Sequence, residues 1–491
     1  MAPSRLQFDL SFAGGARSAA RRSDGPRRLL LLADLGGDRS VPPAQRRPLR
    51  VDIDTLAAVF GRIAPRLALP PQGQAAVLHF ASLDDFHPDA LLATPVFEPL
   101  RRLRADIDSG RSLDDAATAL GLVRDGAVPA PAPAPAATPG VSDIERLLGR
   151  APTQAAHDPL QQWLKDLVAP HVQAAHEHPD AAALRGALDN ATGALMRSLL
   201  HHPALQALEA AWRGVERLVR GLDLDGELQL HLLDVGSDEL QADLAAHRAA
   251  LEHSACHRWF KPGDGADAVR WTLLAVDHRF GPAEADVQAL AALGALAARA
   301  GAPLLANADA ALAGAEAHTL AEPARWRPAD DGSLAWWQAL REATMAPWLG
   351  LVLPRVLMRL PYGGATDPVS GWAFEEMPPG MPATERQAAY LWGGGAPALL
   401  LLAGQALLQA DEGEAADPTG VLDLDDLPSH ITDDDGERRQ QPCAEWPLGE
   451  EAGQALLARG LMPLLSWRQR PAARLLRWQA IASPAQPLSG F

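Results

Sequence analysis

The sequence predicts an α/β protein whose mixed sheets are flanked by helices. Short apolar segments of strand character at 228–235, 271–277 and 302–306 alternate with segments of helical periodicity at 238–255 and 282–300. A strand, helix, strand order requires crossover connections, so we expect at least part of the sheet to be parallel.

The first residues predict a half-buried strand on a tether. Apolar side chains alternate with polar ones at Leu6, Phe8, Leu10 and Phe12. Residues 13–25 are rich in Gly, Ser, Ala and Arg and have no apolar face, which is typical of a flexible tether. Such a strand can pair within its own domain or add to the sheet edge of another molecule, and the residues alone leave both open.

Strands and helices also alternate in the segment that follows the tether. Residues 27–37 predict a short buried strand, and residues 51–69 predict a helix with Asp54 as its N-cap. Residues 76–80 predict a second strand, and residues 82–91 begin a helical stretch with acidic residues near its start.

A proline-rich segment marks a domain boundary. Residues 128–139, VPAPAPAPAATP, cannot form the hydrogen bonds of a helix or sheet and favour an extended spacer. We therefore divide the chain into a domain at 1–125, a linker at 126–141 and a domain at 142–491. The second domain begins with predicted helices, which span residues 142–148, 158–172, 180–200 and 205–219.

The composition indicates an acidic globular protein. Of the 491 residues, 47% are hydrophobic and 21% are charged, and the formal net charge is −17. Residues 1–50 hold ten Arg and four Asp, a balance of +6, so the remaining residues carry −23. We expect no nucleic-acid partner, because binding to phosphate backbones requires clustered basic residues.

The cysteines and the apolar runs favour a cytoplasmic location. Cys256 and Cys443 are the two cysteines, and they lie far apart without a CxxC motif. The apolar run at 29–33 is cut short by Asp34 and cannot form a signal sequence. The longest apolar run, residues 396–408, is too short to span a bilayer, so we expect no membrane insertion.

Residues 351–376, LVLPRVLMRLPYGGATDPVSGWAFEE, combine a buried apolar run with charged residues. Arg355 and Arg359 lie within the run, and a buried arginine needs an anionic partner. Glu375 and Glu376 follow a turn and could supply these partners. The residues fit either a structural set of ion pairs or an active site, and the structural arrangement is the commoner one.

The residues offer little for catalysis or metal binding. The sequence contains no common nucleotide-binding, nucleophile or metalloprotease motif. His253, Cys256 and His257, with His247 upstream, come closest to a metal-binding set, but no fourth ligand is evident. The acidic residues at 433–435 are typical of a solvated loop. We therefore expect no enzymatic activity, no metal and no cofactor.

Several phrases resemble the contractile sheath of the bacterial type VI secretion system. Its large subunit, the TssC-like family, is similar to HHPALQALEAAWRGVERLV, HLLDVGSDEL, LPRVLMRLPYG and YLWGG, which begin at His201, His231, Leu353 and Tyr390. The first phrase contains Trp212 and Arg213, which join the arginines and glutamates above as a structural motif. RVDIDTLAAVFGRIAPRLAL and FASLDDFHPDAL, within residues 50–91, resemble the small subunit, the TssB-like family.

The resemblance implies a natural fusion of the two sheath subunits with a mechanical role. Sheath subunits of this family form a helical tube around an inner tube of Hcp-type rings on a baseplate. Contraction of the tube delivers effectors, and a ClpV-type AAA+ ATPase disassembles the contracted form. Neighbouring subunits are held together by strand exchange, so the resemblance favours donation of the strand Leu6 to Phe12 to a neighbour.

Two departures from the family pattern keep alternatives open. From the resemblance we expect the chain to lack the usual C-terminal domain of the large subunit, which favours, as an alternative, an accessory adaptor, cap or baseplate-associated protein that does not polymerise. The family phrase LWGN is LWGG here, so Gly394 loses a hydrogen-bonding side chain at a turn. An enzyme or metal-binding protein on an α/β scaffold is a third possibility, which fold alone does not exclude.

Overall fold

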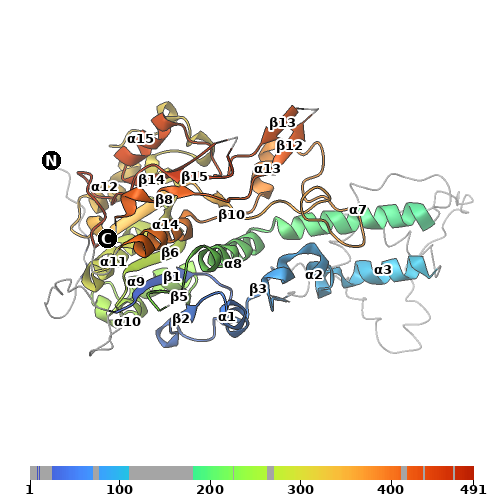
Figure 1. Ribbon diagram of the computed structural model, residues 1–491, viewed down its shortest axis with the longest axis horizontal. Helices are drawn as coiled ribbons and strands as arrows, with labels where there is room; N and C mark the ends of the chain where they lie inside the picture. Colours follow the sequence, from blue (N-terminus) through green and yellow to red (C-terminus); the bar gives the residue numbers. More distant parts are fainter. Residues whose placement is uncertain are drawn as a thin grey trace, which may run out of the picture.

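The computed structural model shows a sheet body from which a two-helix arm projects (Figure 1). The arm consists of α3 (Glu98–Asp108) and α7 (Ala181–Leu200), which pack against each other. The structure describes residues 8, 10, 25–69, 77–109, 181–224, 226–261, 270–410, 417–434, 437–467 and 470–490. The linker and the helices predicted at 142–148 and 158–172 lie outside these described residues.

The body is built on one nine-stranded sheet. Its strands in chain order are β1 (Arg27–Ala33), β2 (Leu49–Val51), β5 (Leu228–Asp234), β6 (Leu273–Phe280), β7 (Leu304–Ala308), β8 (Leu349–Leu353), β11 (Asp423–Leu424), β14 (Leu461–Ser466) and β15 (Ala473–Leu475). Their order across the sheet is β11-β15-β14-β8-β7-β6-β1-β5-β2. Strands β14 to β5 run parallel, whereas β2, β15 and β11 are antiparallel to their neighbours. The predicted mixed α/β fold is confirmed.

In the part of the chain that the structure describes, three two-stranded ladders lie outside this sheet. They pair β3 (Arg66–Ala68) with β4 (Val77–His79), β9 (Val356–Leu357) with β10 (Trp392–Gly393), and β12 (Ile431–Asp434) with β13 (Glu437–Gln440). Each ladder is antiparallel. The β9–β10 ladder joins two of the phrases on which the family resemblance depends, LPRVLMRLPYG and YLWGG.

Helices cover both faces of the sheet. On one face α8 packs against α14, which contacts β5, β1, β6, β7 and β8, and on the other face α9 packs against α11. Helix α14 is buried along most of its length because it is apolar on all sides. Within the described residues, the other α-helices in chain order are α1 (Leu56–Ile63), α2 (Pro88–Leu92), α8 (Pro203–Gly221), α9 (Ser237–Ala246), α10 (Ala255–Phe260), α11 (Glu284–Ala300), α12 (Ala335–Arg341), α13 (Ala383–Ala389), α14 (Gly395–Gln409) and α15 (Glu450–Ala458).

The strand nearest the N-terminus lies inside the sheet. β1 pairs in parallel with β5 on one side and with β6 on the other, and Leu29–Leu32 are fully buried. The segment predicted at 126–141 as a linker therefore does not separate two cores. Residues 27–51 instead contribute two strands to the sheet that residues 228–475 complete.

Most predicted elements within the described ranges are confirmed, with shifted ends. Helix α1 has Thr55 rather than Asp54 as its N-cap, and it ends where Ala64 adopts the left-handed conformation with φ 52°. The helix predicted at 238–255 consists of two helices, α9 and α10. The chain leaves α9 at Ala246 and makes a 3-10 turn at Leu251–His253 before α10 begins.

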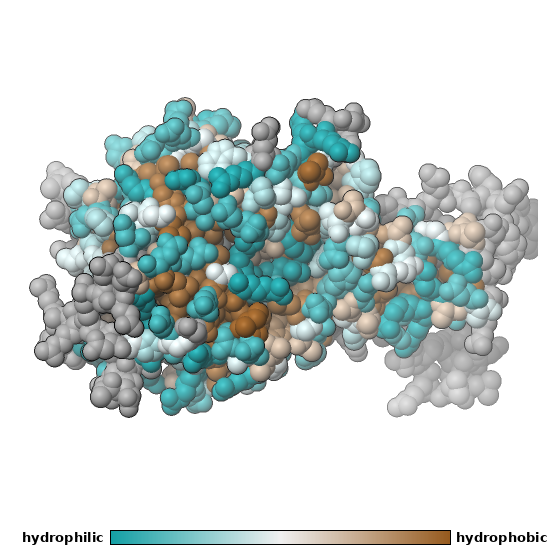
Figure 2. All heavy atoms as spheres, in the orientation of Figure 1, coloured by the Kyte–Doolittle hydropathy of each residue, from teal (hydrophilic) through white to brown (hydrophobic). Residues whose placement is uncertain are grey.

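Hydrophobic residues reach the surface in patches over the sheet body, among hydrophilic residues (Figure 2). The exposed large side chains include Ile53, Ile431 and Trp467. Within the described ranges, no helix combines the length and the apolar character that crossing a membrane requires.

Candidate functional site

A buried network of charged side chains surrounds Arg359. The Arg359 guanidinium is 8% exposed, and its Nε donates to Glu209 Oε1 on α8 at 2.8 Å. Its Nη1 donates to Glu376 Oε2 at 2.7 Å and its Nη2 to Glu376 Oε1 at 3.1 Å. The side chains of Glu209 and Glu376 are each 1% exposed, so this guanidinium offsets the buried charge of both carboxylates.

The electrostatics of the network follow from burial and from the opposed charges. Burial alone would raise the pKa of Glu376, but Arg359, His201 and the Tyr362 backbone N–H bring it down to about 2. Burial alone would lower the pKa of Arg359, whereas Glu209 and Glu376 raise it well above its ordinary value. Glu376 and Arg359 are therefore both ionised at neutral pH, which suits a structural role.

Helix α8 extends this network toward the N-terminal segment. Arg213 Nε donates to Glu209 Oε1 at 2.7 Å, and Arg213 Nη2 donates to the Tyr362 hydroxyl at 3.2 Å. The Tyr362 ring lies under the Arg359 guanidinium, 4.0 Å from ring centre to Cζ, and Trp212 Nε1 donates to Leu35 O at 3.1 Å. Arg213, Arg359 and Glu376 thus meet in one network, whereas Trp212 on the same helix contacts the N-terminal segment.

Arg355 and Glu375 do not belong to this network. Arg355 is 39% exposed and pairs with Glu445, with 2.7 Å between Arg355 Nη2 and Glu445 Oε1. Its neighbour Val356 bridges to Ala444, which directs the arginine toward that strand-like segment. Glu375 is exposed and its Oε1 accepts the Gly364 backbone N–H at 3.0 Å. The prediction that both arginines are buried partners of Glu375 and Glu376 is therefore wrong for Arg355 and for Glu375.

Sequence reasoning missed Glu209, the second anchor of the network. Its one sequence signal is its place on the apolar face of α8, among Leu205, Leu208 and Trp212, which are all buried. A carboxylate on such a face needs a cation, and Arg213 stands one helical turn away.

The N-terminal segment is described at two of its four predicted contact residues. Phe8 and Leu10 are half-buried against the core, and the Phe8 ring lies 6.0 Å from the ring of Trp336 on α12. Neither residue is in a strand, and Leu10 N donates to Phe8 O at 3.0 Å. Leu6 and Phe12 lie outside the described residues, and the exchange of this segment between molecules stays a prediction.

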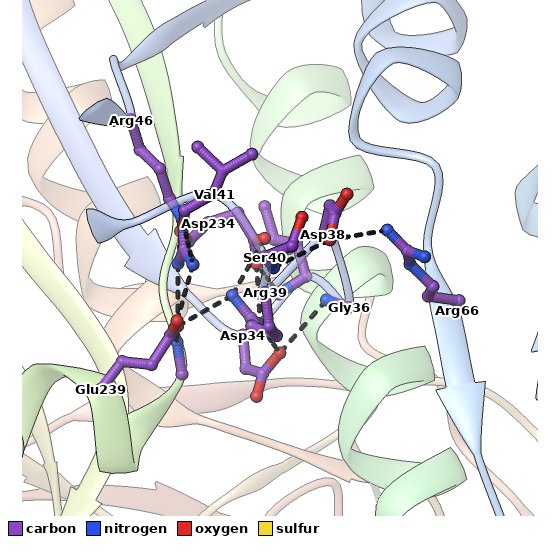
Figure 3. Close-up of polar contacts among 12 residues, drawn as sticks. Asp34, Gly36, Asp38, Arg39, Ser40, Val41, Arg46, Arg66, Asp234 and Glu239 are labelled. Atoms are coloured by element: carbon purple, nitrogen blue, oxygen red, sulfur yellow. Dashed lines mark hydrogen bonds and ion pairs between the residues drawn. The ribbon is translucent and has the colours of Figure 1, made fainter. Parts of the chain in front are cut away.

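A second charged cluster lies where β1 and β5 end (Figure 3). Arg39 Nη1 contacts Asp234 Oδ2 at 3.0 Å and Glu239 Oε2 at 3.1 Å, and the guanidinium also pairs with Asp34. Arg46 Nη2 approaches Glu239 Oε1 at 2.6 Å. The Arg39 side chain is 34% exposed, so water reaches this cluster, unlike the network around Arg359. No sequence motif had indicated it.

The residues that came closest to a metal-binding set include Cys256 on α10, which has a structural partner. The carboxylate of Asp243 on α9 accepts the backbone N–H groups of Ala255 and Cys256, at 3.0 and 3.2 Å, and so holds the start of α10. Burial raises the pKa of the Cys256 thiol well above its ordinary value. Within the described ranges, no group of three or more His, Cys, Asp or Glu side chains is arranged to hold a metal ion.

The fold explains why a glycine stands at position 394, which the sequence did not show. A Cβ at this position would lie 1.9 Å from Asp277 Oδ1 and 2.5 Å from Asn307 Nδ2. Asn307 Nδ2 donates to Asp277 Oδ1 at 2.7 Å, and Asn307 Oδ1 accepts the Ala396 N–H at 2.7 Å at the start of α14. Side chains from β6 and β7 therefore fill the space of the side chain that Gly394 lacks.

Two comparisons with known proteins bear on this architecture. The family described as VipB, EvpB/VC_A0108, tail sheath N-terminal domain, matches residues 184–481. The type VI secretion system sheath protein TssC1 of Pseudomonas aeruginosa strain PAO1 is 27% identical over 310 residues, 61% of this chain and 61% of TssC1. The chain thus matches less than two thirds of the length of that relative.

The family match contains the whole network around Arg359 but begins after the strands β1 and β2. It confirms the resemblance of the later phrases to the large sheath subunit, while the resemblance of residues 50–91 to the small subunit stays a prediction. Because the match covers more than half of the 491 residues, the chain belongs to the VipB tail sheath family.

Proposed function

We propose that this chain is a structural component of a type VI secretion contractile sheath, in which a small-subunit-like and a large-subunit-like segment are fused. The observation that carries the proposal is the position of β1. This strand precedes the family match, yet it pairs with β5 and β6 in the middle of the sheet that the matched residues build. A segment from outside the sheath domain completes its core.

Side-chain contacts between the two segments support a single mechanical unit. The Phe60 and Trp212 rings lie 4.3 Å apart, and the His87 ring meets the Tyr362 ring edge-on at 4.9 Å. These contacts join the segment at 27–109 to α8 and to the loop that carries the Arg359 network. A subunit that transmits force benefits from such contacts, since the two segments cannot move apart without exposing aromatic surface.

The partners in this proposal are those of a sheath. Further sheath subunits would contact the chain along the tube, an Hcp-type inner tube would lie within it, and a baseplate would anchor it. A ClpV-type AAA+ ATPase would act on the contracted form in the bacterial cytoplasm. Neighbouring subunits would be joined by the segment Leu6 to Phe12, whose residues Phe8 and Leu10 lie against the chain's own core in this structure.

Negative-stain electron microscopy of the purified protein, beside a version that lacks residues 1–13, tests the sheath role. Tubes or stacked rings from the intact chain, absent from the shortened one, are the expected result. Uniform small particles from both proteins would contradict self-assembly and favour the accessory adaptor, cap or baseplate-associated protein. A separate sheath pair would then be sought as its partner.

The fusion is tested by cutting the chain after it has folded. A protease site placed within residues 126–141 allows the purified protein to be cleaved, and size-exclusion chromatography then shows whether the fragments stay together. We expect co-elution in a 1:1 ratio, because β1 cannot leave without breaking two ladders. Separation of two soluble fragments would show that the segments are independent, against the proposal.

A further inference from the structure

A cavity of about 810 Å³ opens at the carboxyl ends of β1 and β6. After β1 the chain forms β2 and later β5 on one side of β1, and from β5 it crosses to β6 on the other side of β1. The direction of the crossovers therefore reverses at β1. In open α/β sheets, ligands bind outside the carboxyl ends of the strands at such a reversal.

The walls of the cavity are apolar on one side and charged on the other. The apolar side comes from α8 and from the β3–β4 ladder, through Ala204, Ala207, Leu208, Leu67 and Val77, and Arg66 of β3 adds one charged residue there. The charged side comes from the loop after β1, which includes Asp34 and Arg39, and from Asp277, His278 and Arg279 at the end of β6. A ligand with an apolar body and a charged group matches this division.

The arginines that line the cavity are already paired with carboxylates. Arg39 and Arg46 share Asp34, Asp234 and Glu239, while Arg66 pairs with Asp38 at 3.0 Å and Arg279 with Asp309 at 3.6 Å. Every guanidinium of this set is thus occupied by an acid. Among the carboxyl groups that line the cavity, Asp277 is the one that none of these guanidinium groups pairs with, so a bound cation is favoured over an anion.

Asp277 is the carboxyl group without a counter-ion. Within the described residues, its hydrogen-bond partner is Asn307, and no basic side chain pairs with it. Burial raises the pKa of Asp277 to about 7, which shows the cost of its unpaired charge. The amino end of α14 lies beside it at Gly394, and the helix dipole there favours the ionised form.

We propose that this cavity binds a small organic cation, whose ammonium or guanidinium group pairs with Asp277 and whose apolar body lies against α8. The cation would supply the partner that the described residues do not give this carboxylate. The proposal does not depend on the sheath role, since the cavity lies within one folded chain.

Pentylammonium is the probe and pentanol its uncharged match. Ligand-observed NMR titrations of the full-length protein give the dissociation constant of each. We expect pentylammonium to bind at least tenfold more tightly than pentanol, and the Asp277→Asn variant to lose that difference. Ala207→Trp, which fills the apolar side of the cavity without changing its charge, should weaken both probes at least tenfold.

Asp84→Asn provides the charge-matched control, because Asp84 is exposed and does not line the cavity. It should bind both probes as the unaltered protein does. Equal binding of the two probes, no binding of either, or unchanged pentylammonium binding in Asp277→Asn would each overturn the proposal. If Asp277→Asn does not fold, the Ala207→Trp variant still tests the proposal. Unchanged binding of pentylammonium by Ala207→Trp would show that the probe binds outside this cavity, against the proposal.

Discussion

Glu376 and Asp277 are two carboxyl groups that the fold removes from water in opposite ways. Glu376 lies against the Arg359 guanidinium at 2.7 Å, and its pKa falls to about 2. Asp277 has the amide of Asn307 at 2.7 Å and no basic partner among the described residues, and its pKa rises to about 7. Burial acts in the same direction on both, so the neighbouring cation decides the sign of the shift.

The difference indicates two kinds of site. A carboxylate with a built-in cation is ionised at every physiological pH and holds elements together, as Glu376 holds the loop after β9 to α8 through Arg359. A buried carboxyl group without a cation lowers the stability of the folded state, and such groups are concentrated at binding and catalytic sites. The network therefore belongs to the scaffold, and Asp277 belongs to a candidate ligand pocket.

The largest expected effect comes from removing the shared cation. Arg359→Met leaves Glu209 and Glu376 buried with less compensation, and we expect a loss of about 3–5 kcal/mol in the free energy of unfolding. Urea denaturation at pH 7 measures it. Arg355→Met is the matched control from the same segment, and its half-exposed pair with Glu445 should contribute about 1 kcal/mol or less. Equal losses in both variants would mean that burial does not separate the two arginines.

The next effect is the acid dependence that Glu376 confers. The folded state lowers its pKa from 4.5 to about 2. Its contribution to stability is therefore complete above pH 4.5 and is lost as the pH falls toward 2. On the order of 3 kcal/mol is at stake. We expect the free energy of unfolding to fall less steeply between pH 5 and pH 3 in Glu376→Gln than in the unaltered protein, and parallel curves would contradict this assignment.

Asp277 should give the opposite slope at higher pH. Its pKa rises from 3.8 to about 7 on folding, so the folded state holds the proton more tightly. Stability is then greatest at low pH and decreases as the pH rises from about 4 to 7, by about 3 kcal/mol. Asp277→Asn should remove this decrease, measured as the difference between the two proteins from pH 4.5 to 7.5. Burial lowers the pKa of His231 to about 4, so this residue also changes stability with pH. Its contribution is the same in both proteins and cancels when one curve is subtracted from the other. A constant difference across that range would refute the assignment.

The two regions also differ in how far the sequence could predict them. Periodicity placed α11, β6 and β7, because each buries a regular set of apolar residues that is visible locally. Glu376 was identified as a partner of Arg359 because it lies 17 residues away, across one turn. Glu209 lies 150 residues away and Glu445 lies 90 residues from Arg355, so only the folded chain brings these partners together.

The charged cluster around Arg39 and the cavity could not be predicted for the same reason. Apolar strands carry Asp34, Asp234 and Asp277 at or near their ends. The sequence of a single strand does not determine which strands become its neighbours in the sheet. The proline-rich linker suggested two cores, whereas β1 finds its neighbours on the far side of that linker. Strand pairing between distant segments depends on the summed packing of both faces, which no local pattern contains.

The smallest expected effect comes from Arg39, the exposed counterpart of Arg359. It contacts three carboxylates, yet its side chain is 34% exposed and that of Asp34 is 57% exposed. Water and salt screen such contacts, so Arg39→Met should cost about 1 kcal/mol or less at low salt, and less again in 0.5 M NaCl. Urea denaturation of Arg39→Met and Arg359→Met at both salt concentrations makes the comparison, because the buried network should respond little to salt. If Arg39→Met cost as much as Arg359→Met and its cost did not change with salt, the number of carboxylate contacts rather than their burial would set the stability of these clusters.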